Sequence, residues 1–592
     1  MIRPSRLILA VLGLSLSLMA FGRGAAQTAP STDTQVYEPF PGTVSDSSVP
    51  TLHVTTREIV VDVMVTDANG QPVRDLKKSD FSIDENDKPQ TIRSFQEFGS
   101  EIPVVEPAPP KLPAGVYTNS QSTPATGPVS IMLLDALHCD SAMIVRALEG
   151  AAGYIDTLPQ GTTVAIFWLS ESGLHMLQGF TSDRASLLRA VHNNRTDIGA
   201  CLNGQCLTSY LTDKYTIDAM NQIAAYVSGI KGRKNLIWFT PGMPVDVMRD
   251  GGYAWAGTAV LRAGSRGGSS RGGVFGNNVA GPDMSLVHQL MDVYERFTAE
   301  QIAISPVDPR GVLFGMGMAQ LRADEVAADT GGEAFYNNND LKTEIAKAVD
   351  DGSQFYTLTY IPPKQTDDGH YRRIKVEVDR AGLHLVYRQG YNAERVPTLD
   401  APAPGPALMK ASMEGNAPVA TQILFDVGVW PSLQSIPAAN SQPQPATKTK
   451  PGKTVHYEIQ YGFPASQIAF TEGFAGTLDG SLEFDVVAYD ILRRRVALLT
   501  QTVTMHLSAE QYDDFVARPY RFTQQIDLPP GQLSLHVGIL DNVTSKVGTL
   551  EVPVYVSPVN SKQLAVGPPD ASPASCPPRC LLPTPATAPA TH

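Results

Sequence analysis

The middle of the chain alternates between short apolar runs and amphipathic segments. Four nearly continuous apolar runs lie at residues 128–134, 163–169, 235–240 and 301–307, and the first of them ends in Asp135. Strands that are buried on both faces of a parallel sheet have this composition. Between the runs, apolar residues recur at spacings of three and four, which is typical of helices that cover a sheet. The pattern predicts an α/β domain with a doubly wound sheet.

Three further features complete this domain, which we place at residues 128–392. Residues 173–178 follow the second run after a gap too short for a helical crossover, which predicts an antiparallel edge strand. A Gly/Ser/Arg-rich insert at residues 256–282 is expected to be a mobile loop at the carboxyl edge of the sheet. A last predicted helix leads into three strands that we assign to the same sheet, at residues 355–361, 374–378 and 384–387.

Segments with the pattern of β-strands lie on both sides of the α/β domain. Apolar and polar residues alternate at residues 59–65 before an Asn-Gly turn, so residues 55–99 are predicted to form a small β domain. Residues 420–557 contain strand patterns without a helical period, which predicts a C-terminal β-sandwich of immunoglobulin or fibronectin type. Residues 100–127 and 393–419 are rich in proline and small residues and are predicted to be linkers.

The N-terminal residues have the composition of a secretory signal. Arg3 and Arg6 precede an apolar run at residues 7–21, and small residues follow up to Ala26. This order predicts a signal peptide at residues 1–26 that is cleaved after Ala26. The run is shorter than the roughly 20 residues that span a bilayer, and retention as a membrane anchor is the alternative. We expect an exported protein, either periplasmic or extracellular.

Two polar segments lie outside the predicted domains. Residues 27–54 are rich in Ser, Thr and Pro, and residues 558–592 are rich in Pro, Ala and Thr. Neither has an apolar period, so we expect a flexible spacer and a disordered tail. The formal net charge of the 592-residue chain is −13. This charge argues against a nucleic-acid partner, which requires a basic face.

Export would place the five cysteines in an oxidising compartment. Cys201 and Cys206 enclose Leu-Asn-Gly-Gln, a turn-forming insert, and Cys576 and Cys580 enclose Pro-Pro-Arg. We expect both pairs to form disulfides. Cys139 remains, and we interpret it as a small buried side chain.

Asp135 is the candidate site residue, because ligands collect at the carboxyl ends of strands in open α/β sheets. The stretches around it and along the later strands include VSIMLLDALH from Val129, GRKNLIWFTPGMP from Gly232 and AISPVDPRG from Ala303. In these stretches the chain resembles the secreted von Willebrand factor A (VWFA)-related domain proteins of acidobacteria. The resemblance implies a von Willebrand A-type domain flanked by β domains, without a defined activity.

Von Willebrand A-type domains often bind Mg²⁺ at a metal-ion-dependent adhesion site, built from D-x-S-x-S, a later Thr and a later Asp. Asp135 matches the first Asp, but Leu137 and Cys139 stand at the serine positions, and Pro241 stands where the last carboxylate is expected. Thr216 is the candidate for the Thr. Mg²⁺ prefers an array of oxygen ligands. The resemblance therefore implies a degenerate site with Asp135 and Thr216 as vestigial metal residues, no cofactor, and Mg²⁺ as the alternative.

The sequence offers no strong catalytic motif. G-x-S-x-G occurs at residues 268–272, which include Ser269 and Ser270, but a nucleophile elbow needs a strand before the serine and a helix after it. We therefore expect a non-catalytic protein-interaction or adhesion protein that binds a protein or another envelope macromolecule. One alternative is a secreted hydrolase that uses Ser269 or Ser270. The other is a structural or assembly component of the envelope.

Overall fold

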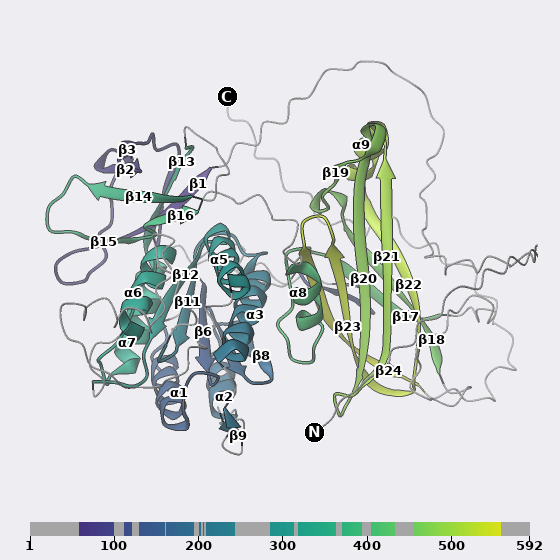
Figure 1. Cartoon of the computed structure of the whole chain (residues 1–592). Helices are drawn as coiled ribbons and strands as arrows, with labels where there is room; N and C mark the ends of the chain where they lie inside the picture. Colours follow the sequence, from purple (N-terminus) through teal and green to yellow (C-terminus); the bar gives the residue numbers. More distant parts are fainter. Residues whose placement is uncertain are drawn as a thin grey trace, which may run out of the picture.

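The computed structural model describes twelve segments of the chain, at residues 58–99, 112–120, 129–159, 161–193, 201–202, 205–206, 209–242, 284–312, 318–362, 370–392, 404–432 and 454–557. An α/β part with a β layer at one end lies beside an elongated β-sandwich (Figure 1). Several sequence predictions lie outside the described residues: the signal peptide, the spacer, the insert at 256–282 with Ser269 and Ser270, the tail, and the pair Cys576 and Cys580.

The α/β part is built on a five-stranded sheet with the order β12-β11-β6-β7-β8. Its first four strands are parallel and largely apolar, and β8 is the predicted antiparallel edge strand. The structure thus confirms a doubly wound α/β sheet. The bounds of the strands are Val129–Asp135 for β6, Val164–Ser170 for β7, Gly173–Thr181 for β8, Lys234–Phe239 for β11 and Ile302–Val307 for β12.

Helices cover both faces of this sheet, and each face has its own buried cluster. One cluster packs α1, α2 and α7 against the sheet, and the other packs α3, α5 and α6 against it. The helix that follows β6 begins where the Asp140 side chain accepts a hydrogen bond from the Met143 N–H at 2.9 Å. The helices are Ser141–Ile155 (α1), Arg184–Asn193 (α2), Ser209–Val227 (α3), Met284–Ala299 (α5), Met318–Thr330 (α6) and Leu341–Ser353 (α7).

The strands after α7 do not extend the parallel sheet, which corrects the predicted boundary at residue 392. Strand β13 pairs with β1 and β4, and β14 pairs with β2, all antiparallel. The two small sheets, β15-β1-β13-β4 and β16-β14-β2-β3, enclose one apolar cluster. The strands are Ile59–Thr66 (β1), Phe81–Glu85 (β2), Lys88–Pro89 (β3), Phe95–Phe98 (β4), Phe355–Tyr360 (β13), Tyr371–Val378 (β14), His384–Tyr387 (β15) and Gly390–Asn392 (β16).

The small β domain is therefore made from two distant parts of the chain. Residues 58–99 supply half of its strands and residues 355–392 supply the other half. A segment of four short strands buries little apolar surface by itself, and pairing with the later strands completes its core. The predicted strands are present, but their partners differ from those expected.

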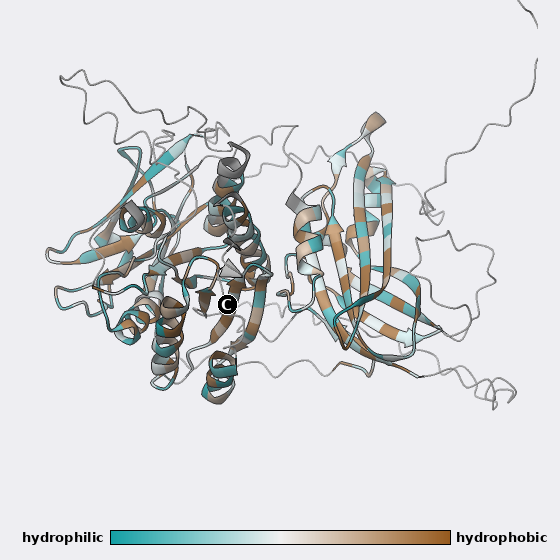
Figure 2. Ribbon diagram, turned by 60° about the horizontal axis from the view of Figure 1, so that its bottom comes forward, coloured by the Kyte–Doolittle hydropathy of each residue, from teal (hydrophilic) through white to brown (hydrophobic). Residues whose placement is uncertain are grey.

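The C-terminal part is a β-sandwich, as predicted, with an apolar cluster between its two sheets. The sheets have the orders β22-β18-β17-β5 and β19-β20-β23-β24, and β21 pairs with β20. Apolar and polar residues alternate along these strands, which Figure 2 shows as alternating colours. The strands are Val116–Thr118 (β5), Asp426–Pro431 (β17), Val455–Pro464 (β18), Thr471–Glu472 (β19), Leu478–Asp490 (β20), Arg495–Leu507 (β21), Pro519–Leu528 (β22), Gly531–Asp541 (β23) and Lys546–Val556 (β24), and the helix Ala509–Val516 (α9) follows β21.

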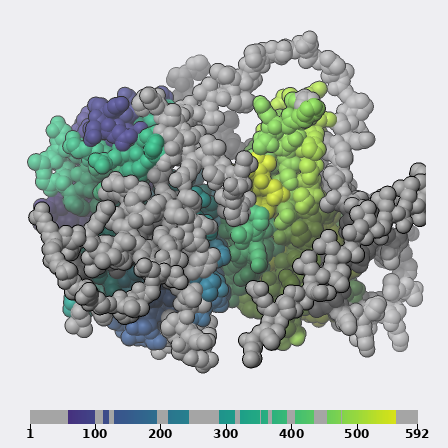
Figure 3. All heavy atoms as spheres, viewed as in Figure 1, coloured from purple at the N-terminus to yellow at the C-terminus, as the bar shows by residue number. Residues whose placement is uncertain are grey.

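Both predicted linkers contain ordered structure that joins the two parts. Strand β5, from the first linker, pairs with β17, and the buried side chain of Asn119 accepts a hydrogen bond from the Phe425 N–H and donates to the Ala420 and Ile423 carbonyls. Helix α8 (Pro404–Ser412), from the second linker, packs between α3 and the sandwich (Figure 3). Within the described segments, no helix is long and apolar enough to cross a membrane.

Candidate functional site

Asp135 lies at the carboxyl end of β6, as the sequence predicted, and its side chain is completely buried. One carboxylate oxygen, Oδ1, accepts hydrogen bonds from the backbone N–H groups of Leu137 at 3.1 Å and His138 at 3.0 Å. The loop after the strand thus folds back over its own carboxylate. Such turns are typical of Asp at the end of an element.

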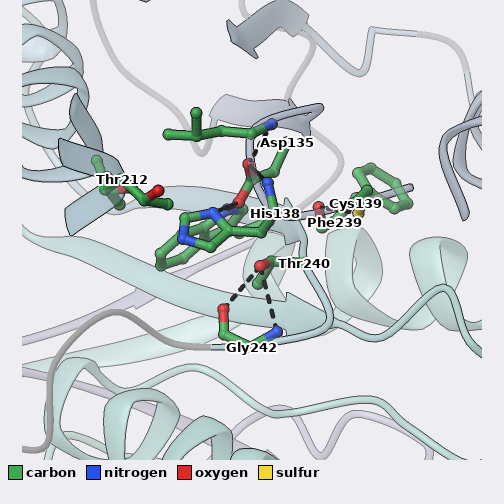
Figure 4. Close-up of polar contacts among 10 residues, drawn as sticks. Asp135, His138, Cys139, Thr212, Phe239, Thr240 and Gly242 are labelled. Atoms are coloured by element: carbon green, nitrogen blue, oxygen red, sulfur yellow. Dashed lines mark hydrogen bonds and ion pairs between the residues drawn. The ribbon is translucent and has the colours of Figure 1, made fainter. Parts of the chain in front are cut away.

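Two side chains form hydrogen bonds with the other carboxylate oxygen, Oδ2. The Trp238 indole N–H donates to it at 2.9 Å, and the His138 Nδ1 lies 2.7 Å away (Figure 4). Trp238 reaches this position because β11 pairs with β6 in parallel, with Trp238 opposite Leu133. Leu133 and Asp135 are two positions apart and share a face of the sheet. Four donors of the chain itself therefore surround the carboxylate.

The His138 imidazole is mostly buried against this carboxylate. Burial by itself lowers the pKa of His138, but the adjacent Asp135 carboxylate and the more distant Asp213 outweigh it and raise this pKa above its ordinary value. The imidazolium form is therefore stabilised beside Asp135. A protonated histidine supplies positive charge next to the carboxylate, where an adhesion site would use a cation.

The two positions of the adhesion-site serines carry side chains that are buried in the fold. Leu137 and Cys139 are both buried, and the Cys139 thiol lies 3.7 Å from the Phe239 carbonyl oxygen. Burial, together with the nearby carboxylates of Asp135 and Asp308, raises the pKa of the Cys139 thiol well above its ordinary range. The thiol form is neither a good nucleophile nor a good metal ligand.

The remaining adhesion-site positions are also engaged within the chain. The buried Thr216 hydroxyl donates to the Thr212 carbonyl oxygen inside α3 at 2.9 Å. The Thr240 hydroxyl donates to the Gly242 carbonyl oxygen at 2.7 Å, and Pro241 follows it in the loop after β11. A proline has no side-chain oxygen to offer a metal.

This donor set does not fit Mg²⁺. Mg²⁺ requires near-octahedral oxygen ligands, whereas Asp135 is surrounded by N–H donors and a sulfur atom lies where a hydroxyl is needed. Among the described residues, no group of three or more His, Cys, Asp and Glu side chains has the arrangement of a metal site.

A second polar cluster lies at the same edge of the sheet, after β12, and the sequence analysis missed it. The Arg310 guanidinium donates to both oxygens of the buried Asp308 carboxylate, with Nε 2.9 Å from Oδ1 and Nη2 2.6 Å from Oδ2. The Gln320 amide also donates to Asp308 at 3.3 Å. The signal was present in the sequence, because Asp308 and Arg310 directly follow a predicted strand.

A shallow hollow lies between this cluster and the loop after β11. The hollow is small and partly open to solvent, and its lining includes Pro241, Arg310, Phe335 and Tyr336. Apolar rings and a paired arginine line it, which is a combination suited to contact with another macromolecule.

The buried Glu344 lies at the start of α7, close enough to Asp308 for the two carboxylates to interact. Burial raises the pKa of the Glu344 carboxyl to about 7, with further contributions from Asp308 and Asp340. Its Oε2 atom has no hydrogen-bond partner among the described residues. The edge of the sheet thus combines two buried carboxylates, Asp308 and Glu344, with only one of them paired to an arginine.

Cys201 and Cys206 lie on a two-stranded hairpin, β9 (Cys201–Leu202) and β10 (Gln205–Cys206). The two cysteines face each other in the antiparallel register. Directly opposed residues have Cα atoms about 4.5–5.5 Å apart, which is within the range that a disulfide spans. The disulfide itself stays a prediction.

No family model matches this chain, and no curated protein was found to be similar to it. The solved structures that it matches include a von Willebrand factor type A protein from Catenulispora acidiphila, with 12% identity and a TM-score of 0.23 over 46% of this chain and 67% of that one. They also include the ArnB paralog VWA2 from Sulfolobus acidocaldarius and three N-terminal domains of the type V pili tip protein Mfa5 from Porphyromonas gingivalis. Each has 9% identity and covers 81% of this chain and 77% of its own, with TM-scores of 0.20 and 0.25.

The matches to von Willebrand A proteins are distant structural similarities. At these scores the likeness is distant and concerns the fold alone. The doubly wound sheet with its antiparallel edge strand carries the assignment of the fold class, and the matches carry no conclusion about activity or partner.

Proposed function

We propose that this protein is exported and non-catalytic, and that it binds a protein or another envelope macromolecule at the carboxyl edge of its parallel sheet without a bridging metal. Metal-free binding is supported by the hydrogen bonds of the Asp135 carboxylate, which contacts four nitrogen donors of its own chain. These donors stand where a metal ion would bind the carboxylate. The signal-like N-terminus supports export.

Exposed apolar side chains support this edge as the contact surface. The helices α1, α3, α5, α6 and α7 begin at the carboxyl edge, whereas α2 follows the antiparallel strand β8 and begins at the opposite edge. Large apolar side chains near these starts are exposed: Val145 of α1, Leu211 of α3 and Leu321 of α6, together with Val312 after β12. Exposed apolar groups around a hollow with a polar rim mark interaction sites.

The proposal is tested by capture of partners from envelope extract with the full chain and with the variant Val145→Asp/Val312→Asp. We expect the variant to lose the captured partner, because both side chains are exposed and a charge there disrupts contact without disrupting the core. The control is Tyr555→Asp, an exposed side chain on the sandwich strand β24. Equal capture by both variants would place the contact elsewhere, and loss of capture in EDTA would show that a metal is required.

The secreted hydrolase remains the alternative, and it is tested separately. A serine-directed probe should leave the intact protein unlabelled if the protein is non-catalytic. Labelling that disappears in Ser269→Ala/Ser270→Ala would establish the hydrolase. The envelope assembly role predicts instead that the captured partner is a structural envelope component.

A further inference from the structure

The turn between β20 and β21 is rigid and exposes two large aliphatic side chains. Ile491 is 74% exposed and Leu492 is 67% exposed. The Asp490 carboxylate holds the turn, because its Oδ1 accepts from the backbone N–H groups of Leu492 and Arg494, both at 2.9 Å. Its Oδ2 accepts from the Arg494 Nε at 2.8 Å. A turn that is organised in this way loses little freedom on binding.

This turn is also cationic. Three arginines follow the aliphatic pair, and Asp490 neutralises only Arg494. Arg493 donates to the amide oxygen of Asn416, which leaves its charge uncompensated by that contact, and Arg495 is exposed. We name Ile491, Leu492, Arg493 and Arg495 the basic tip. It carries apolar surface and positive charge in a chain whose net charge is −13.

The opposite end of the same strand carries apolar surface and negative charge. Phe474, which lies in the turn before β20, is 93% exposed. Helix α9 lies at this end, because it follows β21, whose last residue Leu507 pairs with Leu478 at the start of β20. The exposed acidic side chains there are Glu472, Glu510, Asp513 and Asp514.

We name Phe474 and these four acidic residues the acidic end. The nearest cations of the same segments are Arg518 and His506, and the His506 imidazole is already 2.9 Å from Asp479. Negative charge therefore predominates. Figure 1 shows β19 and α9 together at one extremity of the sandwich.

The basic tip and the acidic end cannot meet within one molecule. They are separated by the whole of β20, which is 13 residues long and extended. At about 3.3 Å per residue, its length is about 40 Å. Each surface therefore needs a partner outside its own sandwich.

We propose that the basic tip of one molecule binds the acidic end of a second copy of this chain. The two surfaces are complementary in charge, and the aliphatic pair of one can cover the exposed Phe474 ring of the other. Such a contact is heterologous, so it leaves a free tip and a free acidic end on every dimer and propagates into linear chains of molecules.

The contact area is small, because a turn and a helix end form it, so each contact is weak. We expect self-association that rises with protein concentration and falls with salt, since exposed charges are screened. Sedimentation velocity of the full chain over a concentration series, at low and high salt, measures this directly. A protein that stays monomeric at every concentration and at low salt overturns the proposal.

Two charge-swap variants test the pairing. Arg493→Glu/Arg495→Glu makes the tip acidic, and Glu510→Lys/Asp513→Lys/Asp514→Lys makes the acidic end basic, because Glu472 is then the one named acid that remains there. Each variant alone carries the same sign at both ends, so we expect its association constant to fall at least about tenfold. An equimolar mixture restores opposite signs at every contact, so the mixture should associate although neither variant does. A mixture that stays monomeric while wild type associates overturns the proposal.

Controls separate this contact from other causes. Phe474→Ser should weaken association, whereas Leu112→Ser, an exposed apolar side chain ahead of β5, should leave it unchanged. Melting temperatures near wild type show that the variants are folded. If the tip variant instead loses binding to anionic phospholipid vesicles while wild type remains monomeric, the tip binds lipid and the proposal is wrong.

Discussion

The carboxylate of Asp135 is completely buried and is held by the His138 and Trp238 side chains as well as by two backbone N–H groups. Asp135→Ala leaves these donors without an acceptor in a buried setting, at a cost of about 1–3 kcal/mol for each group that water does not reach. We expect the free energy of unfolding to fall by about 3 kcal/mol. Urea unfolding measures this change. A loss below about 1 kcal/mol would mean that the donors find other partners.

Metal dependence is a separate prediction about the same residue. Because N–H donors surround Asp135, millimolar Mg²⁺ should not change the melting temperature of the wild-type protein. A ligand present at a hundred times its dissociation constant adds about 2.7 kcal/mol to stability, which a thermal melt resolves. Melts with Mg²⁺, Mn²⁺ or EDTA provide the comparison. A metal-dependent rise that is absent in Asp135→Ala would restore the adhesion-site mechanism.

The raised pKa of His138 gives this site a pH dependence with a definite sign. Since the folded pKa lies above the ordinary value of 6.5, the pairing with Asp135 contributes fully below pH 6.5 and is lost as the pH rises through the folded pKa. His138→Gln retains a hydrogen-bond donor but does not titrate. Wild type should be about 1 kcal/mol more stable than the variant at pH 5.5, and this difference should shrink by pH 8.5. Urea unfolding at both pH values tests this, and a difference independent of pH would contradict it.

At the scale of single elements, the β9–β10 hairpin bears on the predicted disulfide between Cys201 and Cys206. The register sets Cys201 opposite Cys206. We expect peptide mapping without reduction, on protein matured outside the cytoplasm, to find the two joined. Closing so short a loop adds about 2 kcal/mol. Recovery of both as free thiols would exclude either the pairing or the export.

The positions of individual strands could be predicted from the sequence, whereas the strands that they pair with could not. Apolar runs such as Leu236–Phe239 within β11 mark buried strands, because a strand buried on both faces admits few polar residues. The same periodicity does not show which strand is the neighbour in the sheet. The sequence therefore predicted β13 in the parallel sheet, whereas it pairs with β1 in the small β domain. The surroundings of Asp135 were hidden for the same reason, since Trp238 becomes its neighbour only through the register of β11 on β6.

At the scale of the whole molecule, the chain passes repeatedly between its parts. It leaves the small β domain after β4, adds β5 to the sandwich, and then begins the parallel sheet with β6. It returns to the small β domain with β13 and enters the sandwich again with β17. The parts are therefore not separable by a single cut in the sequence.

A shortened chain tests this interleaving. Removal of residues 1–99 takes away β1 to β4 and leaves the buried side chains of Leu358 and Val376 without their apolar partners. We expect this chain to aggregate or to unfold at a lower temperature than the full chain, because the exposed strands present open edges. Removal of residues 1–56 spares every described strand and is the matched control. Equal stability of both shortened chains would contradict the interleaved pairing.

The pairing of Ile59 with Tyr360, and of Tyr117 with Val427, also sets an order of events in time. The parallel sheet draws all its strands from residues 129–307, so among the sheets of four or more strands it is the first whose strands are all available as the chain emerges. The small β domain must wait for β13, and the sandwich must wait until β24 is made. Strand β1 remains unpaired until β13 is made, and β5 remains unpaired until β17 is made. Contacts of such long sequence separation form slowly. The protein is therefore most prone to aggregation while β1 and β5 wait for their partner strands. The length of this period depends on the rate at which the later part of the chain is synthesised.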